Sequence, residues 1–429
     1  METIRRWVSR GTLFWTPLLA IVLALFVVAF QVVPTRVDDG AFQVSLEPKS
    51  NNVEVVSADS GTVLLTGNDA GKHGLLGLRW AGGRALLGPV ISTSDEGALR
   101  CVLPDAHGEI ALPPSGPARV ASEAYFVAPA EDGDASGVAS VRGIALEEVM
   151  VDAGGVRRPA YRAGGGDDWV VLVHGKGGTR EEGMRVAPAL LDLGMTVLSI
   201  SYRDDPESIS GPRPEYDYGR SEWPDLAAAV EYARGEGARR VVLFGYSMGG
   251  GVVANYLLQT AEAGGTLLDA VVLDAPMLDL RATVEHGIAG SRALSWFAGP
   301  LTWTTEFRLQ QDFGAAAYVE GLTRLATSQE MPTLIFHQRG DHLVPTATSE
   351  DAADGSSAIE LVTFDQPGHT RAWNDDPKRY EEELTGFLQR ELDTVQGPLV
   401  SEQTQAVLDA PCGDRTVGEI IEEASTAAR

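Results

Sequence analysis

Cysteine and basic residues are both scarce in this sequence, and each scarcity excludes a class of protein. With only Cys101 and Cys412 among 429 residues, the chain is not a disulfide-dense scaffold. Neither cysteine lies in a spacing typical of a zinc site, and we expect no bound metal or cofactor. Only 34 Lys and Arg stand against 60 Asp and Glu, a net charge of -26. Because binding to nucleic acid requires clustered cations, we expect no nucleic-acid partner.

The remaining composition is that of a globular protein rich in turns. Hydrophobic residues make up 44% of the chain, and there are 48 Gly and 23 Pro. The length of 429 residues exceeds one average domain, so we expect two folded units in addition to an anchor. We find no internal repeat.

The N-terminal segment predicts a membrane anchor. Residues 13–33 (LFWTPLLAIVLALFVVAFQVV) carry no charge, and about 20 apolar residues in a helix span a bilayer. The bases that precede this run are Arg5, Arg6 and Arg10. The positive-inside bias therefore predicts a cytoplasmic tail at 1–12, a single-pass helix at 13–33 and an extracytoplasmic remainder at the cell membrane. The alternative is a cleaved signal peptide with its site at Val27-Val28-Ala29, but the apolar run is longer than usual for one.

Export would also change the chemistry open to the two cysteines. In an oxidising compartment Cys101 and Cys412 could form one disulfide between the middle of the chain and its tail, or they could remain two separate thiols. The sequence leaves both possibilities open.

The part of the chain expected outside the cytoplasm contains two regions with different sequence patterns. Residues 41–145 contain strand-length apolar runs separated by turn residues, among them FQVSLEP, TVLLTG, GLLGLRW, ARVASEAYFV and SVRGIALEEVMV, which predicts a small β-rich unit. Residues 146–394 alternate strands with helices, which predicts an α/β domain with a mostly parallel sheet covered on both faces. Residues 395–429 form a polar extension with one weak helical stretch.

The expected strands of the α/β domain are apolar runs of similar length. They are WVVLVHG (169–175), TVLSISYR (196–203), RRVVLFGYS (239–247), LDAVVLDA (268–275), PTLIFHQ (332–338) and AIELVTF (358–364). Thr179 and Glu182 predict a capping box at the start of the first helix. Residues 279–330 are too long for a plain loop and are rich in Trp, Phe and Leu. They predict either a helical cap or helices packed on the sheet.

Ser247 is the candidate nucleophile. Gly245-Tyr246-Ser247-Met248-Gly249 fits G-x-S-x-G, and it lies between an apolar strand and a glycine-rich helix start. That context predicts a sharp strand–turn–helix elbow, which lifts the serine Oγ above the sheet edge and requires small neighbours.

The segment His174-Gly175-Lys176-Gly177-Gly178 closes an earlier strand and predicts an oxyanion hole. Two backbone N–H groups are needed to stabilise the developing oxyanion. We expect them from Met248, directly after the nucleophile, and from Lys176. His174 is expected to be a structural group rather than a base.

Asp341 and His369 are the candidate acid and base. Asp341 follows an apolar strand, and His369 lies on the loop after the last strand. The chain order serine, aspartate, histidine is the one expected when the serine lies on a strand–turn–helix elbow. His369 would accept the serine proton, while Asp341 would orient the imidazole. The alternative acids are Asp274, Asp279, Asp375 and Asp376, and the poorer alternative bases are His337 and His342.

The stretch 146–392 resembles bacterial α/β-hydrolases of the esterase, lipase and serine-aminopeptidase or prolyl-oligopeptidase-like group. The matching motifs are HGKGG, ISYRDD, EWPDLAAAVEYA, GYSMGG, LDAP, QRGDHLVP and PGHT. The resemblance implies the α/β-hydrolase fold and the catalytic and oxyanion roles given above. A serine at the elbow is unlike the dehalogenase and epoxide-hydrolase branches, which have an aspartate there. Residues 41–145 and 395–429 lie outside the resemblance.

The expected activity is hydrolysis of a carboxylic ester, thioester or amide through an acyl-enzyme on Ser247. An apolar cap and a membrane anchor favour a small-molecule or lipid-like acyl substrate, and so an esterase over a peptidase. A serine peptidase, with Glu285 or Glu306 gripping an amino terminus, and an acyltransferase are the alternatives. A non-catalytic membrane-anchored envelope protein is the alternative from another class.

Overall fold

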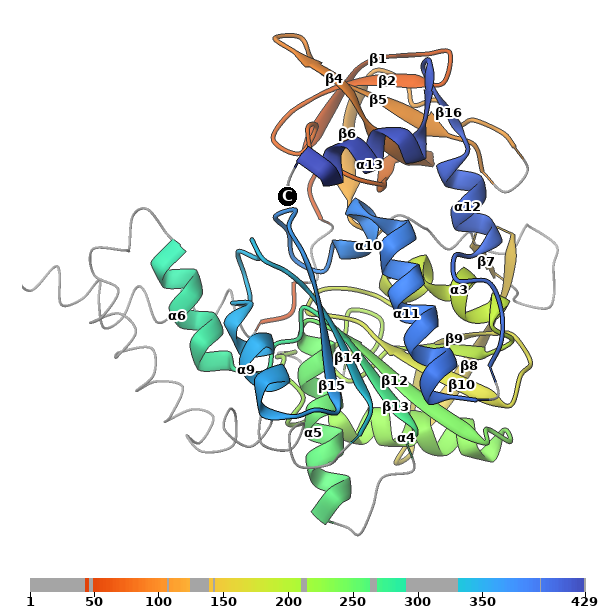
Figure 1. The fold of residues 1–429 in the computed structure, drawn as a ribbon, viewed down its shortest axis with the longest axis vertical. Coiled ribbons are helices and arrows are strands. Elements are labelled where there is room, and N and C mark those ends of the chain that lie inside the picture. Colours follow the sequence, from red (N-terminus) through yellow and green to blue (C-terminus); the bar gives the residue numbers. More distant parts are fainter. Residues whose placement is uncertain are drawn as a thin grey trace, which may run out of the picture.

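The computed structural model describes residues 43–45, 49–105, 108–123, 139–141, 143–209, 214–262, 268–290, 331–393 and 395–427. The anchor predicted at 13–33 lies outside these residues, as does most of the predicted cap, residues 291–330. Within the described ranges, no helix is both long and apolar enough to cross a bilayer. A β-barrel and an α/β sheet domain are visible side by side, with the C-terminal segment running along both (Figure 1).

The α/β domain is built on a nine-stranded sheet with the order β15-β14-β13-β12-β10-β11-β9-β8-β7. Its parallel strands are β10 (Asp168–Val173), β11 (Thr196–Ile200), β12 (Arg240–Tyr246), β13 (Ala270–Asp274), β14 (Thr333–Gln338) and β15 (Ile359–Phe364). All six coincide with predicted runs, and the α/β fold class is confirmed. These strands read as continuous apolar runs because helices cover both faces of the sheet.

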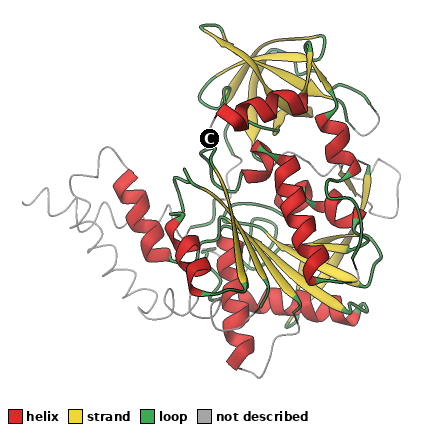
Figure 2. Cartoon of the chain, viewed as in Figure 1, coloured by secondary structure: helices red, strands yellow, loops and turns green. Residues whose placement is uncertain are grey.

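Side chains of β10 show how the two faces are covered. Val170 and Leu172 join one core with α3 (Ala187–Asp192) and α11 (Pro377–Glu391). Trp169, Val171 and Val173 join the other core, with α4 (Trp223–Gly235) and α5 (Met248–Glu262). The helices lie on both sides of the strands in Figure 2. Among the described residues of this domain, further helices are α6 (Leu280–Gly290), α9 (Ala347–Gly355) and α10 (Ala372–Asp375).

The sheet begins earlier in the chain than predicted. The run SVRGIALEEVMV, assigned from sequence to the β-rich unit, forms β7 (Ala139–Val141) and most of β8 (Ile144–Ala153). β8 pairs with β9 (Val156–Ala163), which in turn pairs with β11, all antiparallel. The assignment to the β-rich unit is therefore wrong, because strand pairing rather than local sequence decides which sheet a strand joins.

The predicted capping box is also absent. A 3-10 turn, Glu182–Arg185, precedes α3, and no side chain caps it. The Thr179 Oγ accepts the Glu181 N–H at 3.3 Å, while the Glu182 carboxylate accepts the Gly175 N–H at 2.7 Å. Glu182 thus binds the loop after β10 instead of the start of its own helix.

The β-rich N-terminal unit is confirmed as a closed six-stranded antiparallel barrel. Its strands are β1 (Val53–Asp59), β2 (Thr62–Thr66), β3 (Leu76–Trp80), β4 (Gly83–Ser94), β5 (Gly97–Leu103) and β6 (Gly116–Ala121), in the order β1-β2-β5-β4-β3-β6. Pairing of β1 with β6 closes the barrel, so no strand edge is left open. Val63, Leu65, Leu78 and Leu87 are among the fully buried residues of its interior.

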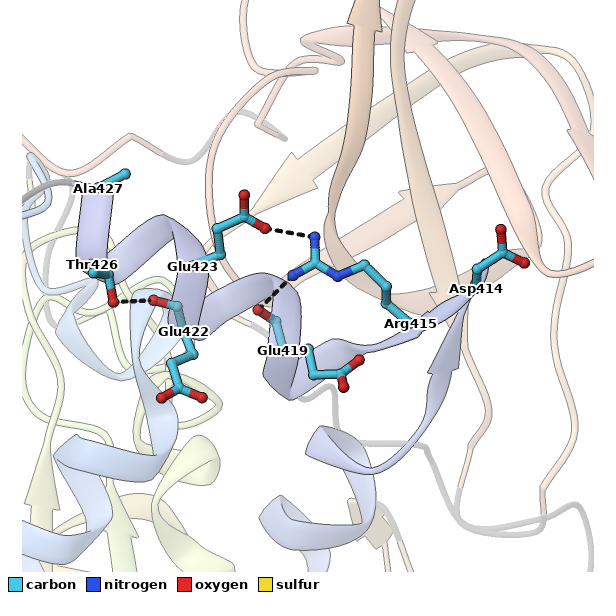
Figure 3. A pocket seen from close by; sticks show the side chains of 7 residues that line it. All are labelled: Asp414, Arg415, Glu419, Glu422, Glu423, Thr426 and Ala427. Atoms are coloured by element: carbon cyan, nitrogen blue, oxygen red, sulfur yellow. Dashed lines mark hydrogen bonds and ion pairs between the residues drawn. The ribbon is translucent and has the colours of Figure 1, made fainter.

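The C-terminal extension is more structured than its sequence suggested. It forms α12 (Glu402–Leu408), the hairpin β16 (Pro411–Cys412) and β17 (Arg415–Thr416), and α13 (Val417–Ala427). The Arg415 guanidinium contacts the first turns of α13, where it donates to the Glu419 carbonyl at 2.8 Å and pairs with Glu423 at 2.6 Å (Figure 3). The sequence predicted one weak helical stretch here, and the described residues form two helices. Apolar residues of α12 and α13 are buried in a shared core, which stabilises both helices.

A disulfide joins the extension to the barrel. Cys101 of β5 and Cys412 of β16 are bonded, with their Cα atoms 5.6 Å apart and 311 positions apart in sequence. Both cysteines lie in the apolar core that also contains Leu172 of the central sheet and Ile421 of α13. Barrel, sheet domain and extension therefore pack into one continuous structure.

Candidate active site

The chain turns sharply between β12 and α5, and Ser247 occupies the turn. Its φ of 48° is a left-handed conformation that a serine rarely adopts. Hydrogen bonds hold it there: the Ser247 N–H donates to the Asp274 carbonyl at 2.9 Å, and the Ser247 carbonyl accepts from Gly250 at 2.9 Å and Met277 at 3.0 Å. Such strain is maintained only where the surroundings impose it, and it is common at functional sites.

Two glycines make this turn possible. A Cβ on Gly245 would lie 2.7 Å from the Gly249 carbonyl oxygen, and one on Gly249 would lie 2.2 Å from the Val173 carbonyl oxygen. No side chain fits at either distance. The small residues of G-x-S-x-G are therefore needed for the close approach of β12, the turn and β10.

Three loops at the carboxyl edge of the sheet bring an alcohol, an imidazole and a carboxylate together. The His369 Nε2 lies 2.7 Å from the Ser247 Oγ, and its Nδ1 lies 2.7 Å from the Asp341 Oδ2. Ser247 follows β12, Asp341 follows β14 and His369 follows β15. The candidate nucleophile, acid and base thus form one hydrogen-bonded line.

Asp341 is held in its ionised form. Its Oδ1 accepts the N–H groups of Leu343 at 2.8 Å and Val344 at 3.0 Å, and its Oδ2 lies 3.4 Å from the His337 Nε2. Burial alone would raise the pKa of this carboxyl. Hydrogen bonds from His337 and His369 and the charge of His369 outweigh burial and place the pKa of Asp341 well below its ordinary value.

The alternative acids are all occupied elsewhere. The Asp274 carboxylate accepts the Tyr380 hydroxyl at 2.8 Å below the elbow, and Asp375 accepts a side-chain amide at 2.8 Å. Asp279 and Asp376 accept backbone N–H groups at the starts of α6 and α11. His369 instead bonds Asp341, the acid after β14.

The remaining candidates lie apart from this line or outside the described residues. His342 is exposed, and Glu285 of α6 pairs with Arg281 at 3.1 Å. Glu306 lies outside the described residues. Across the ranges that the structure describes, no three or more His, Cys, Asp and Glu side chains converge in a way that could hold a metal ion.

The loop after β10 is fixed on both sides of Lys176. The Gly175 N–H donates to Glu182 at 2.7 Å, and the Gly177 N–H donates to the Tyr216 hydroxyl at 3.1 Å. Burial raises the pKa of Tyr216 to about 12, so the phenol stays neutral. Glu182 and Tyr216 were not predicted as site residues. No sequence motif connects Tyr216 with Gly177, which lies 39 positions earlier in the chain.

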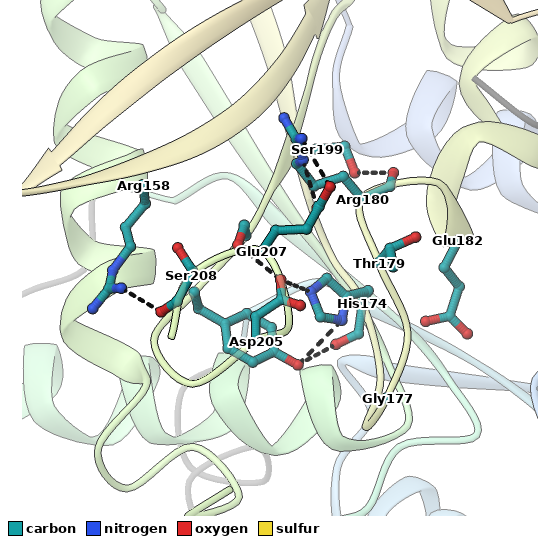
Figure 4. Close-up of polar contacts among 12 residues, drawn as sticks. Arg158, His174, Gly177, Thr179, Arg180, Glu182, Ser199, Asp205, Glu207 and Ser208 are labelled. Carbon is teal, nitrogen blue, oxygen red and sulfur yellow. Dashed lines mark hydrogen bonds and ion pairs between the residues drawn. The ribbon is translucent and has the colours of Figure 1, made fainter. Parts of the chain in front are cut away.

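His174 lies buried beneath this loop, as expected of a structural group (Figure 4). Its Nε2 lies 2.9 Å from the Asp205 Oδ2, its Nδ1 lies 2.8 Å from the Gly175 carbonyl, and its ring stacks on Tyr202 at 4.5 Å. Burial opposes a charge on this imidazole, but the charge of Asp205 and the hydrogen bond to it outweigh burial and raise the pKa of His174. A second histidine–aspartate pair therefore supports the loop.

The sequence profile of the alpha/beta hydrolase family matches residues 170–383, the part of the chain that carries the elbow and all three loops. This part of the chain is an α/β-hydrolase. Its fold is similar to that of the Pyrococcus furiosus esterase Pf2001, with 21% identity, a TM-score of 0.45, and coverage of 58% of this chain and 93% of the esterase.

Two other solved structures resemble the α/β-hydrolase domain. A predicted CIB-like hydrolase from Thermoplasma acidophilum has 21% identity and a TM-score of 0.40, with coverage of 58% of this chain and 100% of its own. Est1E of Butyrivibrio proteoclasticus, solved with ferulic acid, has 16% identity and a TM-score of 0.42, with coverage of 57% and 99%. Among curated proteins, none matches this sequence.

Proposed function

We propose that this protein is a serine hydrolase that cleaves a carboxylic ester, or a thioester or amide, through an acyl-enzyme on Ser247. The observation that carries the proposal is the line from the Ser247 Oγ through His369 to Asp341, with both hydrogen bonds at 2.7 Å. A neutral serine hydroxyl is a weak nucleophile, and a base within hydrogen-bond reach, itself oriented by a third group, is what activates it.

In the proposed reaction the Ser247 Oγ attacks the substrate carbonyl while its proton moves to the His369 Nε2. The ionised Asp341 orients the ring and stabilises the imidazolium. Collapse of the tetrahedral intermediate expels the leaving group, which takes the proton from His369. Water, deprotonated by the same Nε2, then attacks the acyl-serine. The second tetrahedral intermediate releases the carboxylic acid, and the Ser247 Oγ takes the proton back from His369.

The proposed oxyanion donors are the backbone N–H groups of Met248 and Lys176. Met248 is the first residue of α5, so the positive end of this helix adds to the field at the oxyanion. Lys176 lies between two N–H groups that Glu182 and Tyr216 already fix, which supports a rigid loop. Donors fixed before the reaction need no reorganisation as charge develops.

We propose a small-molecule or lipid-like acyl substrate and a location outside the cytoplasm behind the anchor at 13–33. The disulfide supports an exported location, because such bonds persist mainly in oxidising compartments. Removal of residues 1–33 is expected to give a protein that needs no detergent and keeps full activity. An activity that requires the anchor would contradict this proposal.

Labelling by a fluorophosphonate probe tests the nucleophile. We expect wild-type protein to be labelled stoichiometrically and Ser247→Ala not to be labelled. Unlabelled wild-type protein with a cooperative melting transition would favour the non-catalytic envelope protein over the enzyme.

The substrate class is tested by p-nitrophenyl esters of increasing chain length, measured beside aminoacyl anilides. Higher kcat/KM on the esters is expected. A preference for the anilides would show a peptidase acting through the same residues, and acyl transfer to an added alcohol in place of water would show a transferase.

A further inference from the structure

A single buried side chain braces the His369 loop, residues 365–371. Gln338 is only 1% exposed and lies at the end of β14. Its Nε2 donates to the Gln366 carbonyl at 3.0 Å, and its Oε1 accepts the Arg371 N–H at 3.0 Å. The two bonds reach the loop on either side of His369.

The chemistry of the partners fixes which way this carboxamide points. Arg371 offers an N–H, which only the oxygen can accept, while Gln366 offers a carbonyl, which only the nitrogen can satisfy. The nitrogen also donates to the Asp375 Oδ2 at 2.8 Å. The loop lies directly on the carboxamide, since a Cβ on Gly368 would come within 2.7 Å of the Gln338 Oε1.

The flanks of the same loop are tied to the two parts of the protein outside the α/β-hydrolase domain. The Gln366 Nε2 donates to the Ala424 carbonyl of α13 at 2.9 Å. The Arg371 Nη2 donates to the His73 carbonyl of the barrel at 2.6 Å and to Asp375 at 3.1 Å. Barrel and extension, themselves joined by the disulfide, therefore each bind one side of the segment that carries the candidate base.

Packing alone does not hold the loop on its outer side. A cavity of about 300 Å³ lies at the junction, lined in part by His73, Gln366, Asp375, Ile421 and Ala424. Where atoms are missing across a gap, dispersion contacts are lost and cannot fix position. At this junction the directional hydrogen bonds of Gln338, Gln366 and Arg371 therefore contribute to holding the loop in place.

We infer that Gln338 is a positioning residue for His369, and that the barrel and α13 hold the flanks of the loop in the register that the base requires. The inference rests on the proposed function and deepens it. It gives the barrel and the extension, which lack the candidate catalytic residues, a role at the active site. Proton transfer depends on reacting atoms held in place, and a misplacement of about 1 Å can cost about a hundredfold in rate.

The first test is Gln338→Glu in the full-length protein. An ionised glutamate keeps the shape and the acceptor for Arg371 but cannot donate to the Gln366 carbonyl, and it places a second carboxyl beside Asp375. We expect kcat on a p-nitrophenyl ester to fall by about ten- to a hundredfold with KM within about twofold, and fluorophosphonate labelling of Ser247 to slow in parallel. If Gln338 had a purely structural role, the substitution would lower the melting temperature but leave the kcat of the folded protein unchanged.

The second test separates the tie to α13 from general stability. Gln366→Ala removes the bond to Ala424 from a half-buried position and should lower kcat by several-fold. Gln389→Ala is its matched control, because the Gln389 Nε2 makes the same kind of bond, at 2.9 Å, to the Gly397 carbonyl of the extension, away from the loop. The control should keep wild-type kcat.

The outcomes distinguish the two proposals. Two results together would overturn the positioning role and leave the serine hydrolase intact. The first is a wild-type kcat and labelling rate in Gln366→Ala. The second is a Gln338→Glu variant whose kcat is that of wild type, or whose activity falls only in proportion to the loss of folded protein. Full activity in Ser247→Ala would instead overturn the proposed function. A selective loss of kcat in the two glutamine variants, with the Gln389 control unchanged, would support the inference.

Discussion

The pairs His369–Asp341 and His174–Asp205 both lie within the α/β-hydrolase domain, and they differ in what the second ring nitrogen of the histidine faces. In His369 the Nε2 faces the Ser247 hydroxyl at 2.7 Å, so a proton can pass between them. In His174 the Nδ1 faces the Gly175 carbonyl at 2.8 Å, which can only accept a hydrogen bond. The same two residue types thus make a candidate base in one place and a fixed support in the other.

The role of Asp341 gives the first prediction at this scale. Asp341→Asn should lower kcat by about 10⁴-fold, because an amide no longer selects the tautomer that leaves the His369 Nε2 free to accept a proton. The measurement is steady-state ester hydrolysis beside a melting curve. Asp279→Asn, which keeps a helix N-cap, serves as the control and should retain wild-type kcat. Near-normal turnover in the Asp341 variant would show that another group orients the base.

The buried pair His174–Asp205 gives a prediction on pH. The pKa of His174 is raised by Asp205, so its contribution to stability is complete below the unfolded value of about 6.5 and disappears as the pH rises through the folded value. The pKa of Asp205 is lowered, so its own contribution disappears only as acid takes the pH down through that lowered value.

We therefore expect His174→Gln to lose more melting temperature against wild type at pH 6 than at pH 9. Thermal scans across this range measure it, with the exposed His342→Gln as the control whose difference stays near zero. A difference for His174→Gln that grows toward pH 9 would mean that the buried imidazole is neutral.

At the scale of elements, the elbow depends on how closely β12, α5 and β10 approach. Gly249 lies in the first turn of α5, and its missing Cβ makes room for the Val173 carbonyl of β10. Gly386 lies in the middle of α11, where the nearest atom to an added Cβ is an arginine nitrogen at 3.8 Å. The two glycines occupy helices of the same domain under opposite steric conditions.

Gly249→Ala and Gly386→Ala should therefore shift stability in opposite directions. The first must displace backbone and should cost about 2 kcal/mol or more, with loss of fluorophosphonate labelling. The second should stabilise by about 0.5–1 kcal/mol through helix propensity. Urea unfolding measures both. Equal effects of the two substitutions would show that the close approach at the elbow is not a constraint.

At the scale of the molecule, one covalent bond connects segments that are far apart in sequence. The Cys101–Cys412 disulfide closes a loop that contains the whole α/β-hydrolase domain, with the extension lying across the barrel (Figure 1). A cross-link of this kind restricts the unfolded chain and typically contributes about 2–5 kcal/mol.

The variant with both Cys101→Ser and Cys412→Ser should therefore lose about 2–5 kcal/mol of unfolding free energy. Reductant should bring wild type to the level of the variant and leave the variant unchanged. Thiol titration of unreduced, unfolded wild type should find no free thiol from this pair. Two titratable thiols would contradict the bond.

Much of the fold was predictable because its signals are local. The six parallel strands are continuous apolar runs, and burial on both faces imposes that composition on each run by itself. The Ser247 elbow was predictable for a related reason, since the glycines that a sharp turn requires are its immediate neighbours. Errors arose where the local pattern does not decide the partner: β9, the hairpin partner of β8, joins β11 of the central sheet, and Glu182 binds Gly175 rather than its own helix.

The sequence by itself determined the α/β domain, the β-rich unit and a short set of residues with the right chemistry, because strand periodicity and turn sterics act between neighbours along the chain. Only the tertiary structure decided which of five aspartates lies 2.7 Å from His369, that the two cysteines bond, and that Gln338 braces the His369 loop. Each of these depends on the distance between groups that folding brings together, and that distance is not encoded in any local stretch of sequence.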